Sequence, residues 1–272
     1  MEHKSKTSVT VECTPAFDFS NCFRNQAMQK MGVKMPTLTS TGTTIVACIY
    51  KDGVLMGADS RATAGNITAD KACMKVHKIT DSMYACGAGT AADLDQVTKM
   101  LSSQMRLLEL NTGKSARVVA ALRHVKQYLF QYQGYVGAYL LIGGVDPTGP
   151  HLYTVSANGF TLSRAYSAEG SGSYAAISVL ERGFKFDMTK EEAKELVQKA
   201  LEAGMHGDNA SGNSLNLVDI TMNKTEFIGP IVPDFCKRPE PIELKYNFKP
   251  GTTHVLKTKT IKYDVIESME CE

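Results

Sequence analysis

Gly42, Thr43 and Thr44 lie where a polar N-terminal segment gives way to an apolar run. A threonine that cleavage places at an N-terminus has its own base, because its α-amine lies beside its hydroxyl. A free α-amine has a pKa of about 7.7–8.0, so a useful fraction is neutral at physiological pH. Glycine before the threonine would leave the carbonyl open to attack by the hydroxyl. The motif fits an N-terminal nucleophile, although taken alone it is more simply a turn before a strand.

Two glycine-rich segments, residues 87–92 and 170–175, match the relaxed GxGxxG/A pattern of dinucleotide-binding loops. Such a loop requires a second strand ending in an acid about 20 residues further on. In the first segment that distance leads to Glu109, which is still inside a predicted helix. The context therefore argues against a dinucleotide site. Glycine-rich turns between a strand and a helix remain informative, because they direct backbone N–H groups at an anion or oxyanion.

The sequence contains neither the zinc-binding HExxH motif nor the GxSxG motif of α/β-hydrolases. The six histidines show no HExxH spacing, and no GxSxG elbow exists, which excludes an α/β-hydrolase. His77, His124 and His151 are expected to fill the surface or the core rather than to bind a metal.

The composition is that of a globular protein with 272 residues, 43% of them hydrophobic and 21% charged, enough for one large domain or two small ones. The net charge of +2 requires no nucleic acid or acidic lipid as a partner. No apolar run is long enough for a membrane span, and the first residues lead into no secretory signal. Seven scattered cysteines without a CxxC motif predict a reducing compartment.

Hydrophobic periodicity predicts blocks of strands that alternate with pairs of helices. Thr90 and Gly113 are expected to begin and end the first helix, Gly134 ends the second, and residues 189–192 form a capping box for the fourth. The predicted strands are 44–50, 54–59, 75–80, 82–86, 138–143, 151–156, 160–164, 215–221 and 226–232, and the predicted helices are 90–112, 118–133, 173–183 and 189–205. This order predicts two sheets packed face to face with helices outside them, rather than a doubly wound sheet.

Several segments together resemble the catalytic beta subunits of the 20S proteasome, and most closely the trypsin-like type. The segments are GTTIVA at 42–47, GADSRAT at 57–63, Lys75, CGAGTAAD at 86–93, YQGY at 132–135, GGVDPTGPHLY at 143–153 and GSGS at 170–173, with FSNCFRN at 19–25 and GTT at 251–253. The resemblance covers nearly the whole chain. It implies an α+β fold, the four-layer αββα sandwich of N-terminal nucleophile hydrolases. Residues 1–42 would be a propeptide, 43–232 the catalytic domain, and 233–272 an extended arm that contacts a neighbouring subunit.

The resemblance also implies roles for particular residues. Thr43 would be the nucleophile once the Gly42–Thr43 bond is cut, and Lys75, held by Asp59, would lower the pKa of the Thr43 amine. Whether this amine or Lys75 accepts the first proton stays open. The Gly89 N–H would stabilise the oxyanion. The groups expected to fix the amine and a nearby water are Ser171, Asp208 and Ser211.

Substrate binding is implied in the same way. Thr63 and Ala91 would pair with the substrate backbone as an added strand. Asp95 would receive a basic side chain, although without the resemblance it is more simply a solvated helix carboxylate paired with Lys99. The small residues that would leave room for that side chain are Ala62, Cys73 and Gly87. The chain departs from the family at Ala210, where many relatives carry glycine.

The expected protein is thus a threonine endopeptidase, made as a precursor, that cleaves unfolded or ubiquitin-targeted polypeptides after Arg or Lys. It would work in stacked heptameric rings with other beta and alpha subunits, in the cytoplasm and nucleus, without a metal or cofactor. Two alternatives are a non-catalytic ring subunit, which would lack the threonine or its lysine, and a small-substrate amidase of the same nucleophile class. A native mass separates the amidase from a large particle.

Overall fold

The apolar residues that follow Thr44 form the central strands of a sheet. The computed structural model describes residues 20–33, 41–238, 240, 251 and 254–262. Strand β1 (Ile45–Tyr50) and strand β2 (Gly53–Asp59) form the predicted antiparallel hairpin. The strands β11 (Leu215–Thr221) and β12 (Thr225–Ile231) form the second predicted hairpin and pair with β2. Strand β10 (Tyr166–Glu169) pairs with β1, so the sheet order is β10-β1-β2-β11-β12.

The second sheet is built from strands that follow one another in the chain. Its order is β5-β6-β7-β8-β9, and all of its described pairs are antiparallel. Its strands are β5 (Val76–Thr80), β6 (Met83–Gly89), β7 (Ala138–Asp146), β8 (Gly149–Val155) and β9 (Thr161–Ser163).

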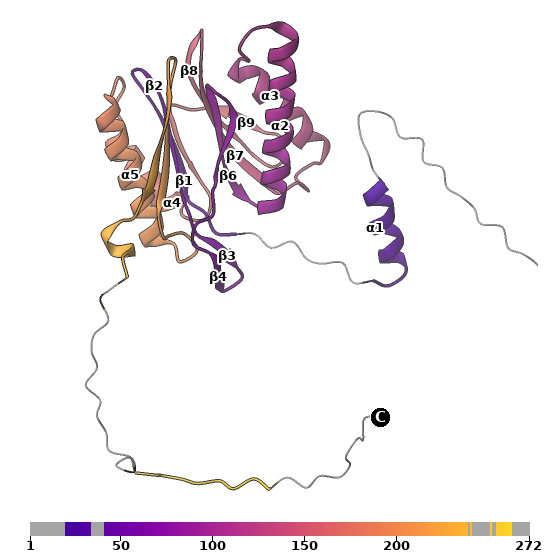
Figure 1. Ribbon diagram of the computed structural model, residues 1–272, viewed down its shortest axis with the longest axis vertical. Coiled ribbons are helices and arrows are strands. Elements are labelled where there is room, and N and C mark those ends of the chain that lie inside the picture. Colours follow the sequence, from indigo (N-terminus) through magenta and orange to yellow (C-terminus); the bar gives the residue numbers. More distant parts are fainter. Residues whose placement is uncertain (1–19, 34–40, 239, 241–250, 252–253, 263–272) are drawn as a thin grey trace, which may run out of the picture. The chain divides into compact units, whose positions relative to one another are not determined.

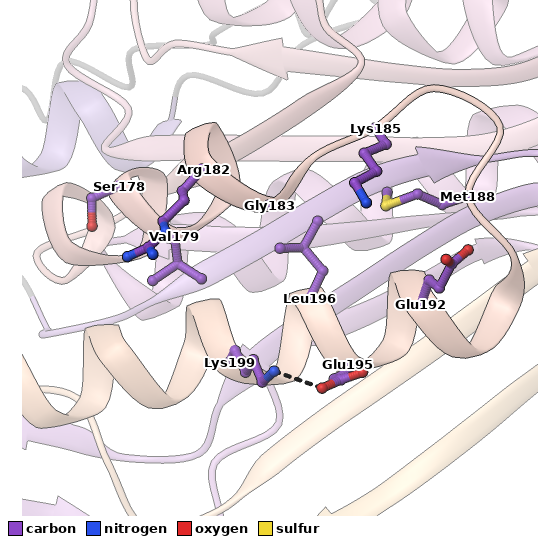
Figure 2. Close-up of a pocket in the computed structure, with 10 residues that line it drawn as sticks. All are labelled: Ser178, Val179, Arg182, Gly183, Lys185, Met188, Glu192, Glu195, Leu196 and Lys199. Atoms are coloured by element: carbon purple, nitrogen blue, oxygen red, sulfur yellow. Dashed lines mark hydrogen bonds and ion pairs between the residues drawn. The ribbon is translucent and has the colours of Figure 1, made fainter.

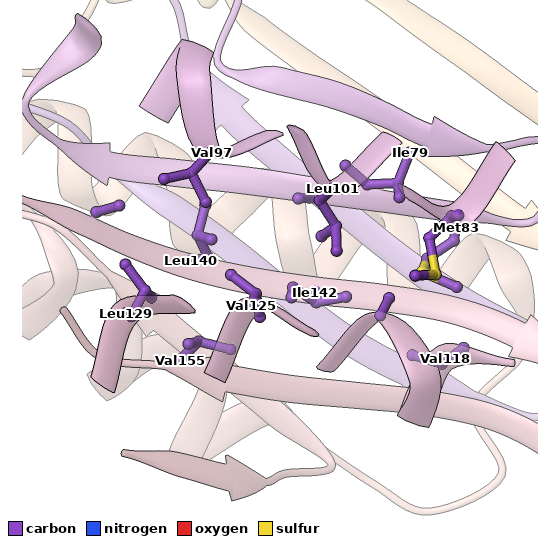
Figure 3. Packing of buried hydrophobic residues seen from close by; sticks show 14 of the residues in the cluster. Ile79, Met83, Val97, Leu101, Val118, Val125, Leu129, Leu140, Ile142 and Val155 are labelled. Atoms are coloured by element: carbon purple, nitrogen blue, oxygen red, sulfur yellow. The ribbon is translucent and has the colours of Figure 1, made fainter. Parts of the chain in front are cut away.

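Two pairs of helices cover the outer faces of the sheets (Figure 1). The helices are α2 (Ala91–Thr112) and α3 (Val118–Gln131) on the second sheet, and α4 (Ser173–Gly183) and α5 (Lys190–Gly207) on the first. Between α2, α3 and their sheet, Val97, Leu101 and Val125 pack against Leu140 and Ile142 (Figure 3). A further buried cluster that includes Ile45, Met56 and Leu141 joins the two sheets. The expected αββα sandwich is therefore confirmed.

Most helix ends follow the sequence signals. The capping box at Thr189 is present, with the Glu192 N–H donating to the Thr189 hydroxyl and the Thr189 N–H donating to the Glu192 carboxylate. Gly113 ends α2 in the left-handed conformation, with φ of 65°. The expectation for Thr90 holds only in part: it occupies the N-cap position, but its side chain makes no capping hydrogen bond.

Four elements described in the structure, β3 (Ala62–Ala64), β4 (Ile67–Asp70), β10 and α1 (Ser20–Lys30), were not predicted. The small hairpin of β3 and β4 is largely exposed, so it lacks the apolar alternation by which strands are found. Strand β10 was also missed: it is four residues long, and its one buried residue is the polar Ser167. Helix α1 lies within the predicted propeptide, and it buries none of its residues, so it carries no periodic signal.

The predicted C-terminal arm begins inside the folded body of the chain. Beyond Val232, the 3-10 helix η1 (Asp234–Cys236) follows, and Cys236 packs on the core between the first sheet and α4 and α5. The chain separates into a second unit only from Arg238 onward, so the first turn of the predicted arm belongs to the folded body. Much of the expected arm, including Pro239, Pro241, Pro250 and residues 252–253, lies outside the described residues, as do residues 1–19 of the propeptide.

The cysteines that the structure describes, Cys22, Cys48, Cys73, Cys86 and Cys236, are all free thiols. Cys13 and Cys271 lie outside the described residues. Among the described helices, none is long and apolar enough to cross a membrane.

Candidate active site

Thr43 is buried immediately before β1, with 2% of its surface exposed. Its hydroxyl donates a hydrogen bond to the carbonyl oxygen of Gly42 over 2.7 Å. Its backbone N–H donates to the hydroxyl of Ser171 over 3.1 Å. The predicted nucleophile therefore lies against the carbonyl of the bond that would have to be cut, and a side chain from a distant part of the chain holds its nitrogen.

A buried ion pair lies beside this carbonyl. The ammonium of Lys75 is 2.8 Å from Oδ1 of Asp59, and it also donates to the Gly42 carbonyl oxygen over 3.0 Å. Lys75 is 5% exposed and Asp59 is fully buried. A buried ion pair needs further hydrogen bonds to offset the loss of hydration of both charges.

The Asp59 carboxylate has those hydrogen bonds. Its Oδ1 accepts from the Thr44 N–H over 2.9 Å. Its Oδ2 accepts from the N–H groups of Arg61 and Gly212 over 3.1 and 3.0 Å. Three backbone donors thus fix the orientation of the carboxylate at the end of β2, and the carboxylate in turn directs Lys75 toward Gly42.

The other predicted amine-binding residues form a connected network. Oδ2 of Asp208 accepts from the hydroxyls of Ser171 and Ser211 over 2.6 and 2.7 Å. Ser211 also accepts a hydrogen bond from the Thr44 hydroxyl over 2.8 Å. Burial raises the pKa of Asp208, but the hydrogen bonds from Ser171, Ser211 and the Ala210 N–H outweigh it and hold this pKa below its ordinary value. The network therefore connects an ionised carboxylate to the Thr43 nitrogen through the Ser171 hydroxyl.

Gly89 lies at the end of β6, where the chain before Thr43 pairs with it. Thr41 forms an isolated antiparallel bridge with Gly89, and the Thr41 hydroxyl donates to the Gly89 carbonyl over 3.2 Å. The Gly42 N–H donates to the hydroxyl of Thr63 on β3 over 3.1 Å. A side chain at position 89 is excluded, because φ is +122° and a Cβ would lie 2.3 Å from the Gly137 carbonyl oxygen. Ala91 begins α2 two residues beyond Gly89, and Thr63, the other residue predicted to bind a strand, contacts the segment before Thr43.

The residues expected to line the pocket for a basic side chain have other neighbours within this chain. The would-be Cβ of Gly87 lies 2.7 Å from Cδ2 of Leu94, so in this chain the missing side chain makes room for Leu94. The carboxylate of Asp95 is paired with Lys99 over 2.7 Å, which is the plainer of the two predicted interactions. Burial is the main cause of the raised pKa of the Cys73 thiol, and the nearby charge of Lys75 opposes this rise. Ala62 lies on β3, opposite Asp70 of β4.

His77, which the sequence predicts to fill the surface or the core, also lies near Asp95 and Lys99. Burial lowers the pKa of its imidazole, while the charge of Asp95 raises this pKa and that of Lys99 lowers it. His77 therefore lies beside the predicted acceptor of a basic side chain and is disposed to be neutral there. The signal available in the sequence was strand alternation, which places His77 on the same face as Ile79, under α2.

A separate cavity of about 920 Å³ opens between α4 and α5 (Figure 2). Its wall includes an ion pair between Glu195 and Lys199 at 2.6 Å, and Glu192 is engaged in the capping box. None of the predicted site residues lines it. The cavity on the helical face is therefore distinct from the cluster around Thr43.

Comparisons with known proteins point to one family. Residues 39–220 match the family described as "Proteasome subunit". The chain is 46% identical to "Probable proteasome subunit beta type-2" of Schizosaccharomyces pombe, over 93% of this chain and 94% of the relative. It is 47% identical to "Proteasome subunit beta type-7" of Dictyostelium discoideum, over 89% and 90%. It is 42% identical to "Proteasome subunit beta type-10" of Bos taurus, over 94% and 96%.

Proposed function

The chain belongs to the proteasome subunit family, and from this premise we propose that Thr43 is its catalytic nucleophile, exposed by cleavage of the Gly42–Thr43 bond. It is a threonine endopeptidase subunit of the 20S core, of the trypsin-like type, which cleaves unfolded polypeptides after basic residues. It assembles with other beta and alpha subunits in stacked rings.

Self-cleavage uses the geometry around the Gly42 carbonyl. The Thr43 oxygen attacks the Gly42 carbonyl carbon, so that an O–C bond forms while the Gly42–Thr43 C–N bond breaks. The nitrogen keeps its hydrogen and gains the hydroxyl proton, which leaves a free amine and an ester to the propeptide. Water then hydrolyses the ester, releasing the propeptide as a carboxylate and restoring the hydroxyl. The hydrogen bond from Lys75 draws electron density from the Gly42 carbonyl and so favours the attack.

The mature centre repeats this chemistry on a substrate. The Thr43 amine takes the proton of the hydroxyl as the oxygen bonds to the substrate carbonyl carbon. The same proton passes to the departing amine when the peptide C–N bond breaks, and water hydrolyses the resulting ester. The Gly89 N–H stabilises the oxyanion, an effect typically worth about 3–4 kcal/mol. Lys75 stays paired with Asp59, while Ser171, Asp208 and Ser211 hold the amine and the water.

One observation carries the proposal: the carbonyl oxygen of Gly42 accepts hydrogen bonds from both the Thr43 hydroxyl and the Lys75 ammonium. The test is the intact mass of this subunit isolated from the assembled particle. Wild-type chains should begin at Thr43, and the Thr43→Ala chain should keep its propeptide and lose hydrolysis after arginine. A wild-type chain that stays uncut while the particle keeps this activity would overturn the assignment.

The same proposal covers the chain ends and the site of action. Residues 1–42 act as a propeptide and the segment from about 238 onward reaches a neighbouring subunit. The particle works in the cytoplasm and nucleus, which the reducing conditions expected from the free cysteines support. Cell fractionation with an antibody against the assembled subunit tests this location.

A further inference from the structure

A small cavity directly borders the reaction centre. It has a volume of about 210 Å³ and is lined by Thr41, Ala88, Gly89, Tyr139, Glu169 and Gly170. Gly170 lies so close to Thr43 that a Cβ there would be 2.1 Å from the Thr43 carbonyl oxygen. None of Ala62, Cys73, Gly87 and Asp95, the residues expected to receive the side chain before the cleaved bond, is part of this wall. The cavity is therefore a second space at the centre, and departure of the propeptide removes Thr41 from it.

Glu169 gives this cavity an acidic wall. It ends β10, it is half-buried, and its carboxylate has no hydrogen bond or ion pair within the described part of the chain. Burial raises the pKa of Glu169, and the charge of Arg164 opposes that rise. A partly desolvated carboxylate without a paired cation is stabilised when a cationic group comes beside it.

Tyr139 adds a second group suited to a cation. Its side chain is 44% exposed and lies against Gly89, with Cδ2 3.4 Å from the position of a Cβ there. Lysine and arginine side chains bind favourably over the face of an aromatic ring. Carboxylate and ring together therefore favour a cationic side chain over an apolar or acidic one.

A second space at the edge of the first sheet shares Glu169 with this cavity. Glu169 also lines a space of about 470 Å³ whose wall is formed by residues 163–169 with Ile177 and Glu181. Strand β10 is the last strand in the order of that sheet and pairs with β1 alone among the described strands. The free edge of such a strand can bind an extended peptide through backbone hydrogen bonds. A peptide paired with this edge would therefore pass Glu169, which also lines the cavity beside Thr43.

The position of Ser171 indicates which half of a substrate takes this path. The departing amine must form beside the Thr43 nitrogen, which Ser171 holds, and Glu169 is two residues before Ser171. The other half is expected to lie along Thr63 and Ala91. We propose that the Glu169 cavity binds the lysine or arginine side chain of the residue that follows the cleaved bond. This inference rests on the proposed function of Thr43, and it adds a specificity determinant on the departing side.

The test uses assembled particles that carry wild-type, Glu169→Gln or Glu195→Gln subunits. Glu195 is an exposed glutamate on α5 that undergoes the same chemical change away from the cavity. Internally quenched peptides have arginine before the cleaved bond and arginine, citrulline, alanine or glutamate after it, and the rate of a Thr43→Ala particle is subtracted. The readout is the ratio of kcat/KM for arginine over alanine after the bond.

The wild-type ratio should be about fivefold, the size expected for one partly exposed charge pair. Citrulline, which has the shape of arginine without its charge, should fall to the alanine rate. Glu169→Gln should bring the ratio close to one, and Glu195→Gln should leave it at the wild-type value.

The possible failures separate the two proposals. A wild-type ratio near one, or a ratio that Glu169→Gln leaves intact, overturns the inference while hydrolysis after arginine still stands. Hydrolysis after arginine that equals that of the Thr43→Ala particle overturns the proposed function instead. If Glu169→Gln subunits do not assemble, equal rates for arginine and citrulline on the wild-type particle still overturn the inference without a variant.

Discussion

The ammonium of Lys75 lies 3.0 Å from the carbonyl oxygen of Gly42, which belongs to the bond proposed to be cleaved. The same ammonium is 2.8 Å from Asp59, and both members of this ion pair are buried. One side chain thus connects a fully hydrogen-bonded carboxylate at the end of β2 to the reacting carbonyl. The position of Lys75 matters both for stability and for the proposed chemistry.

Replacing Lys75 with alanine should therefore have two effects. The propeptide should stay attached, and the free energy of unfolding should fall by about 3–5 kcal/mol, because Asp59 is left buried and unpaired. The control is Lys78→Ala, which removes an exposed pair with Asp81 at 2.6 Å and should change little. Intact mass and incorporation into the particle check both effects. Normal processing in the Lys75→Ala chain would contradict the role assigned to Lys75.

A side chain at position 42 should block processing. A Cβ on Gly42 would lie 1.9 Å from Cβ of Ala210 and 2.6 Å from the Ala210 carbonyl oxygen. Gly42→Ala should thus displace the scissile carbonyl and slow propeptide removal at least tenfold, as expected when a misplacement of about 1 Å can cost 100-fold. The double variant with Ala210→Gly should recover only in part, because the backbone oxygen remains. Mass spectrometry over a time course of assembly measures this, and wild-type kinetics in Gly42→Ala would count against the geometry.

Replacing Ala210 alone should have little effect, although Ala210 is the residue that a side chain at position 42 would meet. Ala210→Gly removes only a methyl group, and the Ala210 N–H can still donate to Oδ1 of Asp208, as it does over 3.0 Å. Processing and hydrolysis after arginine should stay within about twofold of wild type, because the hydrogen bond to Asp208 is kept and the lost methyl group leaves Gly42 unobstructed. A much larger loss would mean that the alanine fixes the loop that holds Asp208.

Asp95 and Lys99 form an ion pair on one face of α2, and substitutions of the two residues should have opposite effects on substrate binding. If Asp95 receives the basic side chain before the cleaved bond, Lys99 competes for it from 2.7 Å. Asp95→Asn should lower kcat/KM for peptides with arginine at that position, and Lys99→Gln should raise it, each by about two- to fivefold because the pair is exposed. Peptides with an uncharged residue at that position provide the control. Equal effects on charged and uncharged peptides would remove Asp95 from the pocket.

The hydrogen bonds to Asp208 predict how acid affects the enzyme. Because they hold its pKa below the ordinary value of about 3.9, the stability gained from the ionised group is fully present above that pH. It is lost as pH falls through the lower value in the folded protein. Ser211→Ala removes one donor, so the pKa should rise and the acid loss of activity should begin at higher pH.

Rates measured from pH 6 to pH 3 check this shift. The matched control is Ser178→Ala on α4, where the lost hydroxyl donates only to the Ala175 carbonyl. An acid limb that stays at the wild-type pH in Ser211→Ala would show that Asp208 does not control it.

The sequence alone determined the elements whose signals are local. The β1–β2 hairpin follows from β-branched residues on either side of a short turn, and the start of α5 follows from the capping box at Thr189. The pairing of Thr43 with Asp59 and Lys75 as candidates came from motifs that resemble one family, and not from any geometry. Each of these signals spans only a few residues, so it is readable without knowledge of the fold.

Only the tertiary structure decided which of these groups meet. Lys75 reaches Gly42 across 33 residues and Ser171 reaches Thr43 across 128, distances over which sequence periodicity carries no information. The acidic wall at Glu169 has the same origin, because a four-residue edge strand became visible only when it paired with β1. Gly87 shows the same dependence, since only the structure reveals that a Cβ there would lie 2.7 Å from Cδ2 of Leu94. Such contacts depend on how two sheets and four helices pack together, and that packing is a property of the whole domain.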